Sequence, residues 1–160
     1  MGLDISASRS AKLVRDNADK DYDGYDDGLQ HVYVNPAFPA QADGMVSGWY
    51  KMDPEDEVDF RAGSYSGYNL WREQLAALVD INPRDVWNAQ QPPSGPFVEL
   101  INFSDCEGVI GPVTSAKLAR DFAEHQAKAD AHEDEWFRTR YVHWREAFEL
   151  AARGGCVRFH

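Results

Sequence analysis

The feature that most constrains the fold is a stretch of about forty residues, 113–153, that contains neither glycine nor proline. One continuous helix of this length would measure about 60 Å at 1.5 Å per residue. A compact domain of 160 residues should be only about 40 Å across. The charged cluster 132–135 offers a place for a break, so the sequence predicts two antiparallel helices. In the alternative, one helix projects from the body and pairs with a second copy of the chain, forming a homo-oligomer.

The chain before this stretch has the patterns of β-strands. Residues 2–8 alternate apolar and polar side chains, and short runs at 31–34, 47–52 and 58–62 are bounded by turn residues. The compact apolar run from Phe97 to Phe103 predicts a buried strand. Between these runs, Trp71, Leu75 and Leu78 recur at helical spacing, which predicts a short helix capped by Ser66.

Together these patterns predict one α+β domain with a mainly antiparallel sheet, one short helix and two long C-terminal helices. We expect residues 1–112 to be sheet-rich, with a helix starting at Gly111-Pro112, because proline suits the first turn. We expect residues 113–153 to be helical. Gly154-Gly155 should end the last helix, and residues 156–159 should return as the final strand.

Charge and composition exclude several function classes. The chain carries 27 acidic and 16 basic residues, a net charge of −11, which disfavours direct nucleic-acid binding. No apolar run approaches the roughly 20 residues needed to span a bilayer, and residues 1–14 lack a signal-peptide core. We therefore expect a cytoplasmic protein without a membrane partner, in which Cys106 and Cys156 are free thiols.

Two polar turns, each leading toward a helix, form the main candidate site. The turn at 63–69 combines hydroxyl, amide, aromatic and guanidinium groups, which suit a planar polar ligand such as a nucleotide. The turn at 104–108 would supply the opposite wall. The alternative, weighed evenly for the first turn and favoured for the second, is that these groups cap helices and brace turns. The predicted ligand-binding residues are Ser64, Tyr65, Tyr68, Asn69, Arg72, Ser104, Asp105 and Glu107.

The turn at 104–108 also suggests catalysis, as a less favoured alternative. Asp105 and Glu107 could act as an acid and base pair, with or without a divalent ion, in a hydrolase. Cys106 is a poor nucleophile by sequence, because two flanking carboxylates raise the pKa of a thiol. We therefore favour a binding protein that needs no cofactor over an enzyme.

The acidic loop 16–28 partly matches a calcium-binding loop. Alternating aspartates are followed by Gly24 at the sixth position, but Gln30 stands where a bidentate glutamate should close the site. We therefore interpret the loop as a solvated acidic segment. A calcium site is the less favoured alternative, with ligands Asp19, Asp21, Asp23 and Asp27.

The net negative charge supports one further class, a protein that binds a basic protein surface in place of nucleic acid. Its charged patches would be 16–27, 53–59 and 130–135. Separately, the segments Met1–Ile5, Tyr65–Arg72 and Phe103–Pro112 resemble small phage and prophage proteins. The resemblance brings no activity and no site residues with it. It implies an accessory phage protein, for which antagonism of host defence is one role.

Overall fold

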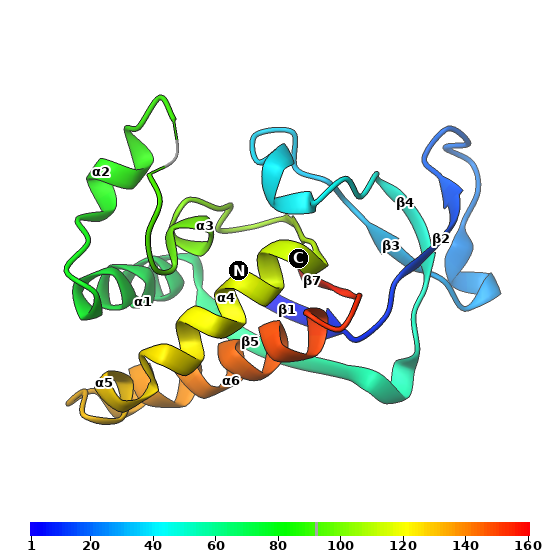
Figure 1. Ribbon diagram of the computed structural model, residues 1–160. Helices are drawn as coiled ribbons and strands as arrows, with labels where there is room; N and C mark the ends of the chain where they lie inside the picture. Colours follow the sequence, from blue (N-terminus) through cyan, green and yellow to red (C-terminus); the bar gives the residue numbers. More distant parts are fainter. Residues whose placement is uncertain (92) are drawn as a thin grey trace.

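Two antiparallel sheets form the β part of the protein, and the computed structural model describes residues 1–91 and 93–160 (Figure 1). The larger sheet has the strand order β5-β1-β7-β6, and the smaller has the order β2-β4-β3. The larger sheet consists of β1 (Gly2–Ser8), β5 (Glu57–Ser64), β6 (Gly108–Ile110) and β7 (Cys156–Phe159). The smaller consists of β2 (Lys12–Asp16), β3 (Gln30–Val32) and β4 (Gly48–Lys51).

The three longest helices pack against the larger sheet, and the smaller sheet lies at the other end of the molecule (Figure 1). The α-helices are α1 (Tyr65–Leu78), α2 (Pro83–Trp87), α3 (Val98–Ile101), α4 (Pro112–Glu124), α5 (Gln126–Asp130) and α6 (Glu135–Ala151). Short 3-10 helices are η1 (Gly24–Asp27), η2 (Pro39–Ala42) and η3 (Pro54–Asp56). This arrangement confirms the α+β class with antiparallel sheets. None of the described helices is long and apolar enough to cross a membrane.

The long C-terminal stretch folds back on itself, as its length predicted. The chain reverses between α5 and α6, where the Asp134 side chain accepts a hydrogen bond from Trp136 N and so caps α6. α4 and α6 then lie side by side in one chain (Figure 1). Because the two helices cover each other, pairing with a second chain is not needed to bury their apolar faces.

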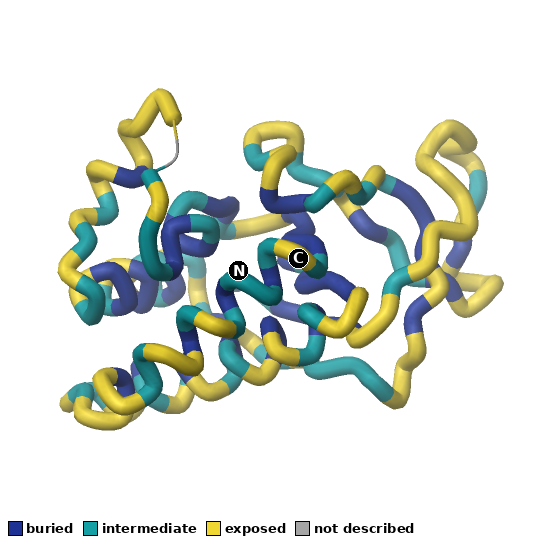
Figure 2. The backbone as a smooth tube through the Cα atoms, viewed as in Figure 1, coloured by how far each residue is buried: buried dark blue, intermediate teal, exposed yellow. Residues whose placement is uncertain are grey.

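Alternation along β1 gives the larger sheet two different faces. Leu3, Ile5 and Ala7 are buried against the helices, in a core that includes the stacked rings of Trp71 and Trp144. Figure 2 shows this buried core under the helices and the exposed loops at both ends of the molecule.

The opposite face of the larger sheet carries polar side chains and supports the smaller sheet. Ser8 lies on this face, where its hydroxyl is 3.1 Å from Met52 Sδ just beyond β4. A second, small apolar cluster joins the two sheets around Tyr50, Val109 and Cys156. Further along the same face the smaller sheet no longer covers β1, and a cleft opens between the sheets.

Residues 98–101 form a short helix, so the strand predicted over 97–103 is wrong. Phe97 adopts a left-handed conformation with φ of 61°, and its backbone N–H donates to Asp121 Oδ2 at 3.0 Å. Helix α3 follows immediately, with Leu100 and Ile101 fully buried. A short buried apolar run has the same pattern in either structure, because no polar side chain marks an outer face.

The cap of α1 also differs from the prediction. Ser64, and not Ser66, precedes the first turn, and its Oγ accepts a hydrogen bond from Gly67 N at 3.1 Å. Helix α1 therefore begins at Tyr65, directly after β5. This direct connection places Tyr65 at the edge of the larger sheet, beside the cleft.

Candidate functional site

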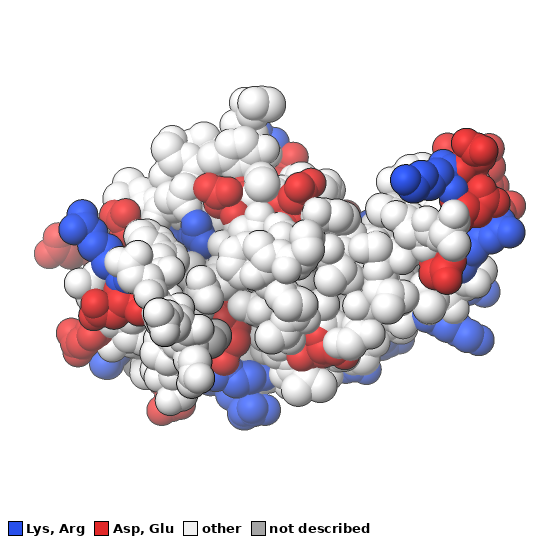
Figure 3. Space-filling model, turned by 90° about the horizontal axis from the view of Figure 1, so that it is seen from above, with Lys and Arg blue, Asp and Glu red and all other residues white. Residues whose placement is uncertain are grey.

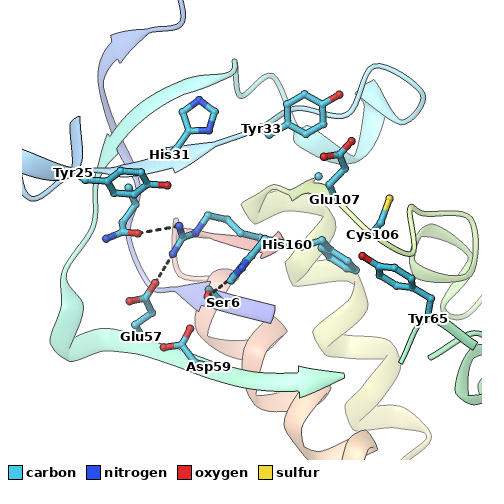
Figure 4. Close-up of a pocket in the computed structure, with 14 residues that line it drawn as sticks. Ser6, Tyr25, His31, Tyr33, Glu57, Asp59, Tyr65, Cys106, Glu107 and His160 are labelled. Atoms are coloured by element: carbon cyan, nitrogen blue, oxygen red, sulfur yellow. Dashed lines mark hydrogen bonds and ion pairs between the residues drawn. The ribbon is translucent and has the colours of Figure 1, made fainter. Parts of the chain in front are cut away.

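The candidate site is a cleft of about 680 Å³ between the polar face of the larger sheet and the smaller sheet (Figure 4). Its volume is in the range of pockets that bind small molecules. Its lining residues come from several strands and from both polar turns. They are Ser6, Tyr25, Gln30, His31, Tyr33, Glu57, Asp59, Tyr65, Cys106, Glu107, Gly108, Arg158, Phe159 and His160.

The floor of the cleft is a polar row across three strands. Ser6 of β1 pairs with Asp59 of β5 on one side and with Arg158 of β7 on the other. Directly paired residues in antiparallel strands place their side chains on the same face of the sheet. The strand pairing therefore brings a hydroxyl, a carboxylate and a guanidinium together from three distant parts of the chain.

Arg158 is already paired within the protein. Its guanidinium donates to Glu57 Oε1 at 2.5 Å and to Gln30 Oε1 at 3.1 Å. The third guanidinium nitrogen, Nε, is buried. Only 12% of the Arg158 side chain is exposed, so the ion pair with Glu57 is well shielded from water. The pair links β7 to β5 across the cleft floor, and the Glu57 carboxylate neutralises the Arg158 guanidinium.

His160 stands between the walls of the cleft (Figure 4). Its Nε2 is 2.9 Å from Ser6 Oγ, and its backbone pairs with Asp4. A serine and histidine at this distance could in principle perform nucleophilic chemistry. However, Ser6 lies in a central strand whose backbone N–H groups are used by the neighbouring strands. The backbone N–H groups of this strand are therefore not free to stabilise an oxyanion, and the contact orients the imidazole ring.

His31 contributes a largely uncharged ring to the wall formed by the smaller sheet. Burial lowers the pKa of His31, and the charge of Arg158 acts in the same direction. The ring packs against Trp49 with centroids 5.0 Å apart, and its Nε2 is 3.1 Å from Asn17 Oδ1. The neutral imidazole therefore offers hydrogen bonding to a ligand but adds little positive charge.

The second polar turn supplies a wall beside the segment that follows β3. Asn35 donates to Glu107 O at 3.0 Å, and Glu107 N donates to Ser104 Oγ at 3.1 Å. Gly108 follows with φ of 141°, in a position where a Cβ would lie 2.9 Å from the Phe103 ring. The turn is thus fixed through its backbone, while the Glu107 side chain is exposed beside Tyr33 (Figure 4).

The structure brings the two predicted turns together, but most of their polar groups bind the protein itself. Asn69 Nδ2 donates to Asp105 Oδ2 at 3.1 Å. Arg72 donates to the backbone oxygens of Ile101 and Phe103, at 3.1 and 2.6 Å, and to Asn69 Oδ1. We call Asn69, Arg72 and Asp105 the closed network. It locks α1 to the segment that follows α3.

The remaining predicted residues divide between the interior and the cleft. Tyr68 is fully buried, and the Arg72 guanidinium lies 4.7 Å above its ring. Burial raises the pKa of Tyr68, so the phenol stays protonated. Ser64 caps α1. Of the eight predicted residues, only Tyr65 and Glu107 line the cleft.

Three of the four aspartates proposed as calcium ligands accept local hydrogen bonds. Asp19 accepts from Asp21 N and Asp23 from Tyr25 N, while Asp27 accepts from the Tyr22 hydroxyl. Across residues 1–91 and 93–160, no group of three or more His, Cys, Asp or Glu residues is placed to hold a metal ion. The calcium site stays a prediction, without a gathered set of ligands to support it.

Comparisons of the chain with protein-family models, with curated proteins and with solved structures gave no match. The cleft residues that sequence reasoning missed are chiefly Tyr33, Asp59, Arg158 and His160. Alternation along β1 and β5 marked the outward face that carries Ser6 and Asp59. It gave no indication of which strands would be neighbours, and the cleft depends on that pairing.

Proposed function

We propose that this protein binds a small polar molecule with a planar group, of the kind found in a nucleobase or nucleoside, in the cleft between the two sheets. The observation that carries the proposal is the convergence of both polar turns and five strands on one cavity of about 680 Å³. We prefer a binding role to catalysis, because Asp105 is bonded to Asn69 and does not line the cavity with Glu107.

The chemistry of the lining supports a planar ligand. Tyr25 and Tyr33 are 61% and 39% exposed, and Tyr65 is half-buried at the opposite side of the cleft. Aromatic faces of this kind stack on flat rings, while their hydroxyls remain available for hydrogen bonds. His160 and Glu107 add hydrogen-bonding groups at the walls. The closed network holds the walls in place and is not itself the binding surface.

The test is a thermal-shift and calorimetric screen of the intact chain with nucleobases, nucleosides and nucleotides. A ligand at one hundred times its Kd should add about 2.7 kcal/mol to the free energy of unfolding. Tyr33→Ala should weaken binding about tenfold, because one stacking face is lost. Leu70→Ala, at an exposed position on α1, is the control and should bind as the wild type does. Absence of binding by every compound at saturating concentration would contradict the proposal.

The wider role remains the one that the resemblance implied, an accessory phage protein that could sequester a small molecule used in host defence. The resemblance segments contribute Tyr65, Cys106 and Glu107 to the cleft, which supports a shared role for them. Growth of a defended host strain, with and without the protein and its Tyr33→Ala variant, tests this role. If the wild type and the variant antagonise the host defence equally, the role in host defence does not depend on the cleft.

The two alternative functions receive less support. The acidic segments 16–27 and 130–135 lie at opposite ends of the molecule (Figure 1), whereas nucleic-acid mimicry needs one contiguous surface. Basic side chains also lie among the acidic ones at the end of the molecule that holds β2 (Figure 3). For the hydrolase alternative, Asp105 is tied to Asn69 and only Glu107 lines the cleft. The two carboxylates therefore do not converge on one reacting atom.

A further inference from the structure

The ionisable groups of the cleft are unbalanced toward negative charge. Its lining has three carboxylates, on Glu57, Asp59 and Glu107, against the single guanidinium of Arg158. Glu57 and Arg158 form the ion pair already described and cancel each other. In the described part of the chain, the side chains of Asp59 and Glu107 take part in no ion pair and no hydrogen bond. Two carboxylates thus remain to interact with a ligand.

These two carboxylates lie on different sides of the cleft. Asp59 projects from β5 beside Glu57, and Glu107 projects from the turn before β6 beside Tyr33 (Figure 4). Both residues are exposed, so neither charge is removed from contact with an entering molecule. A cation between the walls would be attracted from both sides, whereas a phosphate would be repelled from both.

The other lining groups favour the same sign of charge. The ring of His31 is kept largely neutral by burial and by Arg158, since both lower its pKa. The two terminal nitrogens of the Arg158 guanidinium donate hydrogen bonds to Gln30 and Glu57. Its Nε is buried. Tyr25, Tyr33 and Tyr65 present ring faces, whose negative quadrupole attracts an ammonium group.

We infer that the cleft selects a ligand bearing an amine, in which a planar group stacks on tyrosine and the ammonium meets Asp59 or Glu107, and that it rejects the phosphorylated form of the same scaffold. This inference rests on the proposed binding function and narrows it from nucleotide-like molecules to cationic ones. If Arg72 bound the ligand, the protein would prefer a phosphate to an amine, and this inference predicts the reverse. Arg72 is buried and committed to backbone oxygens, so it cannot receive a phosphate.

The test uses three probes that share one planar group and differ in charge: adenosine, 5′-amino-5′-deoxyadenosine and adenosine 5′-monophosphate. A second set, tryptamine and indole-3-propionate, repeats the comparison on another ring. Calorimetric titration at pH 7 and low salt should rank amine above neutral probe above phosphate, with steps of about fivefold in Kd. The amine preference should shrink as salt is raised, because the contacts are exposed to solvent.

Charge-removing variants locate the effect. Asp59→Asn and Glu107→Gln should each lower the affinity for the amine by about fivefold and leave the adenosine affinity nearly unchanged. Glu57→Gln keeps an acceptor for Arg158 but removes the neutralising charge, so it should raise the affinity for the phosphate probe. Asp85→Asn and Glu146→Gln, at exposed positions outside the cleft, are the matched controls and should change none of these rankings.

The outcomes separate this inference from the function on which it rests. Equal or tighter binding of the phosphate probe at the cleft, abolished by Tyr33→Ala, would overturn the charge selectivity and leave the binding function standing. Failure of all five probes to bind would overturn both. An amine preference that survives the Asp59→Asn, Glu107→Gln double variant would overturn the assignment of these carboxylates.

Discussion

Two neighbouring groups of polar side chains use their hydrogen-bonding capacity in opposite ways. In the closed network, Arg72 is 5% exposed and donates to two backbone oxygens and to Asn69. In the cleft, Asp59 and Glu107 are exposed and remain without a partner in the described residues. Both groups contain charged side chains. A chemically rich turn is therefore evidence of a ligand site only where its groups are not already satisfied by the protein.

The closed network has a clear structural task. At the end of α3, which packs against α1, the helix has no further turn to supply donors for its last backbone oxygens. A guanidinium can serve several oxygens at once in a fixed geometry, and its stem packs in the interior. Arg72 thus lets the chain pass through a buried region without leaving those carbonyl groups unpaired.

The largest contrast is expected between the two thiols. Burial raises the pKa of Cys156 to about 12, and this thiol lies in the small cluster that joins the sheets. Cys106 is exposed at the cleft. Since the thiolate is the reactive form, a thiol reagent at pH 8 should modify Cys106 about a thousandfold faster than Cys156. Mass spectrometry of the intact chain and its peptides measures both rates, with unfolded protein as the control in which they converge. Similar rates in the native protein would show that the two sheets separate readily.

Removing the guanidinium of the closed network should have the largest effect on stability. Arg72→Met leaves the oxygens of Ile101, Phe103 and Asn69 without their donor, which should cost about 3 kcal/mol in the free energy of unfolding. Denaturant unfolding followed by fluorescence measures the change. Arg84→Met, at an exposed position on α2, should stay within about 0.5 kcal/mol. If Arg72→Met lost ligand affinity without losing stability, Arg72 would be a ligand-binding residue, and the distinction between the closed network and the cleft would be wrong.

A smaller loss is expected from the serine of the second turn. Ser104 Oγ accepts hydrogen bonds from Cys106 N and Glu107 N, at 3.2 and 3.1 Å. Ser104→Ala should therefore lower the free energy of unfolding by about 1 kcal/mol and loosen the wall that carries Glu107. Ser10→Ala, at an exposed position, is the matched control. Amide exchange at residues 105–107 should quicken in the variant, and unchanged exchange there would count against the bracing role.

The cleft carboxylates should be the least important for stability. Asp59→Asn combined with Glu107→Gln should change the free energy of unfolding by no more than about 0.5 kcal/mol, because neither side chain has a partner to lose. Slight stabilisation is the expected sign, since two negative charges leave an acidic protein. A loss above about 1.5 kcal/mol would show that these residues brace the fold, and the contrast with the closed network would disappear.

Local signals in the sequence predicted the elements whose cause is itself local. Gly111-Pro112 begins α4, because proline is suited to the first turn of a helix. The length of residues 113–153 predicted a reversal, and the structure places it between α5 and α6. The alternating strand β1 and the final strand β7 were also predicted at their observed positions. The prediction of a strand over 97–103 was wrong because periodicity does not separate a buried helix from a buried strand.

By itself, the sequence determined the class of fold and the positions of most elements. That the two polar turns lie close together was a hypothesis. Only the tertiary structure decided which polar groups are left for a ligand. Ser6, Asp59 and Arg158 lie side by side because β1 pairs with β5 and β7, at separations in sequence that no local pattern encodes. The same pairing sets Arg158 against Glu57. Charge that is neutralised by a distant partner and charge that is left free look alike in a sequence, since the difference arises only when strands are brought together.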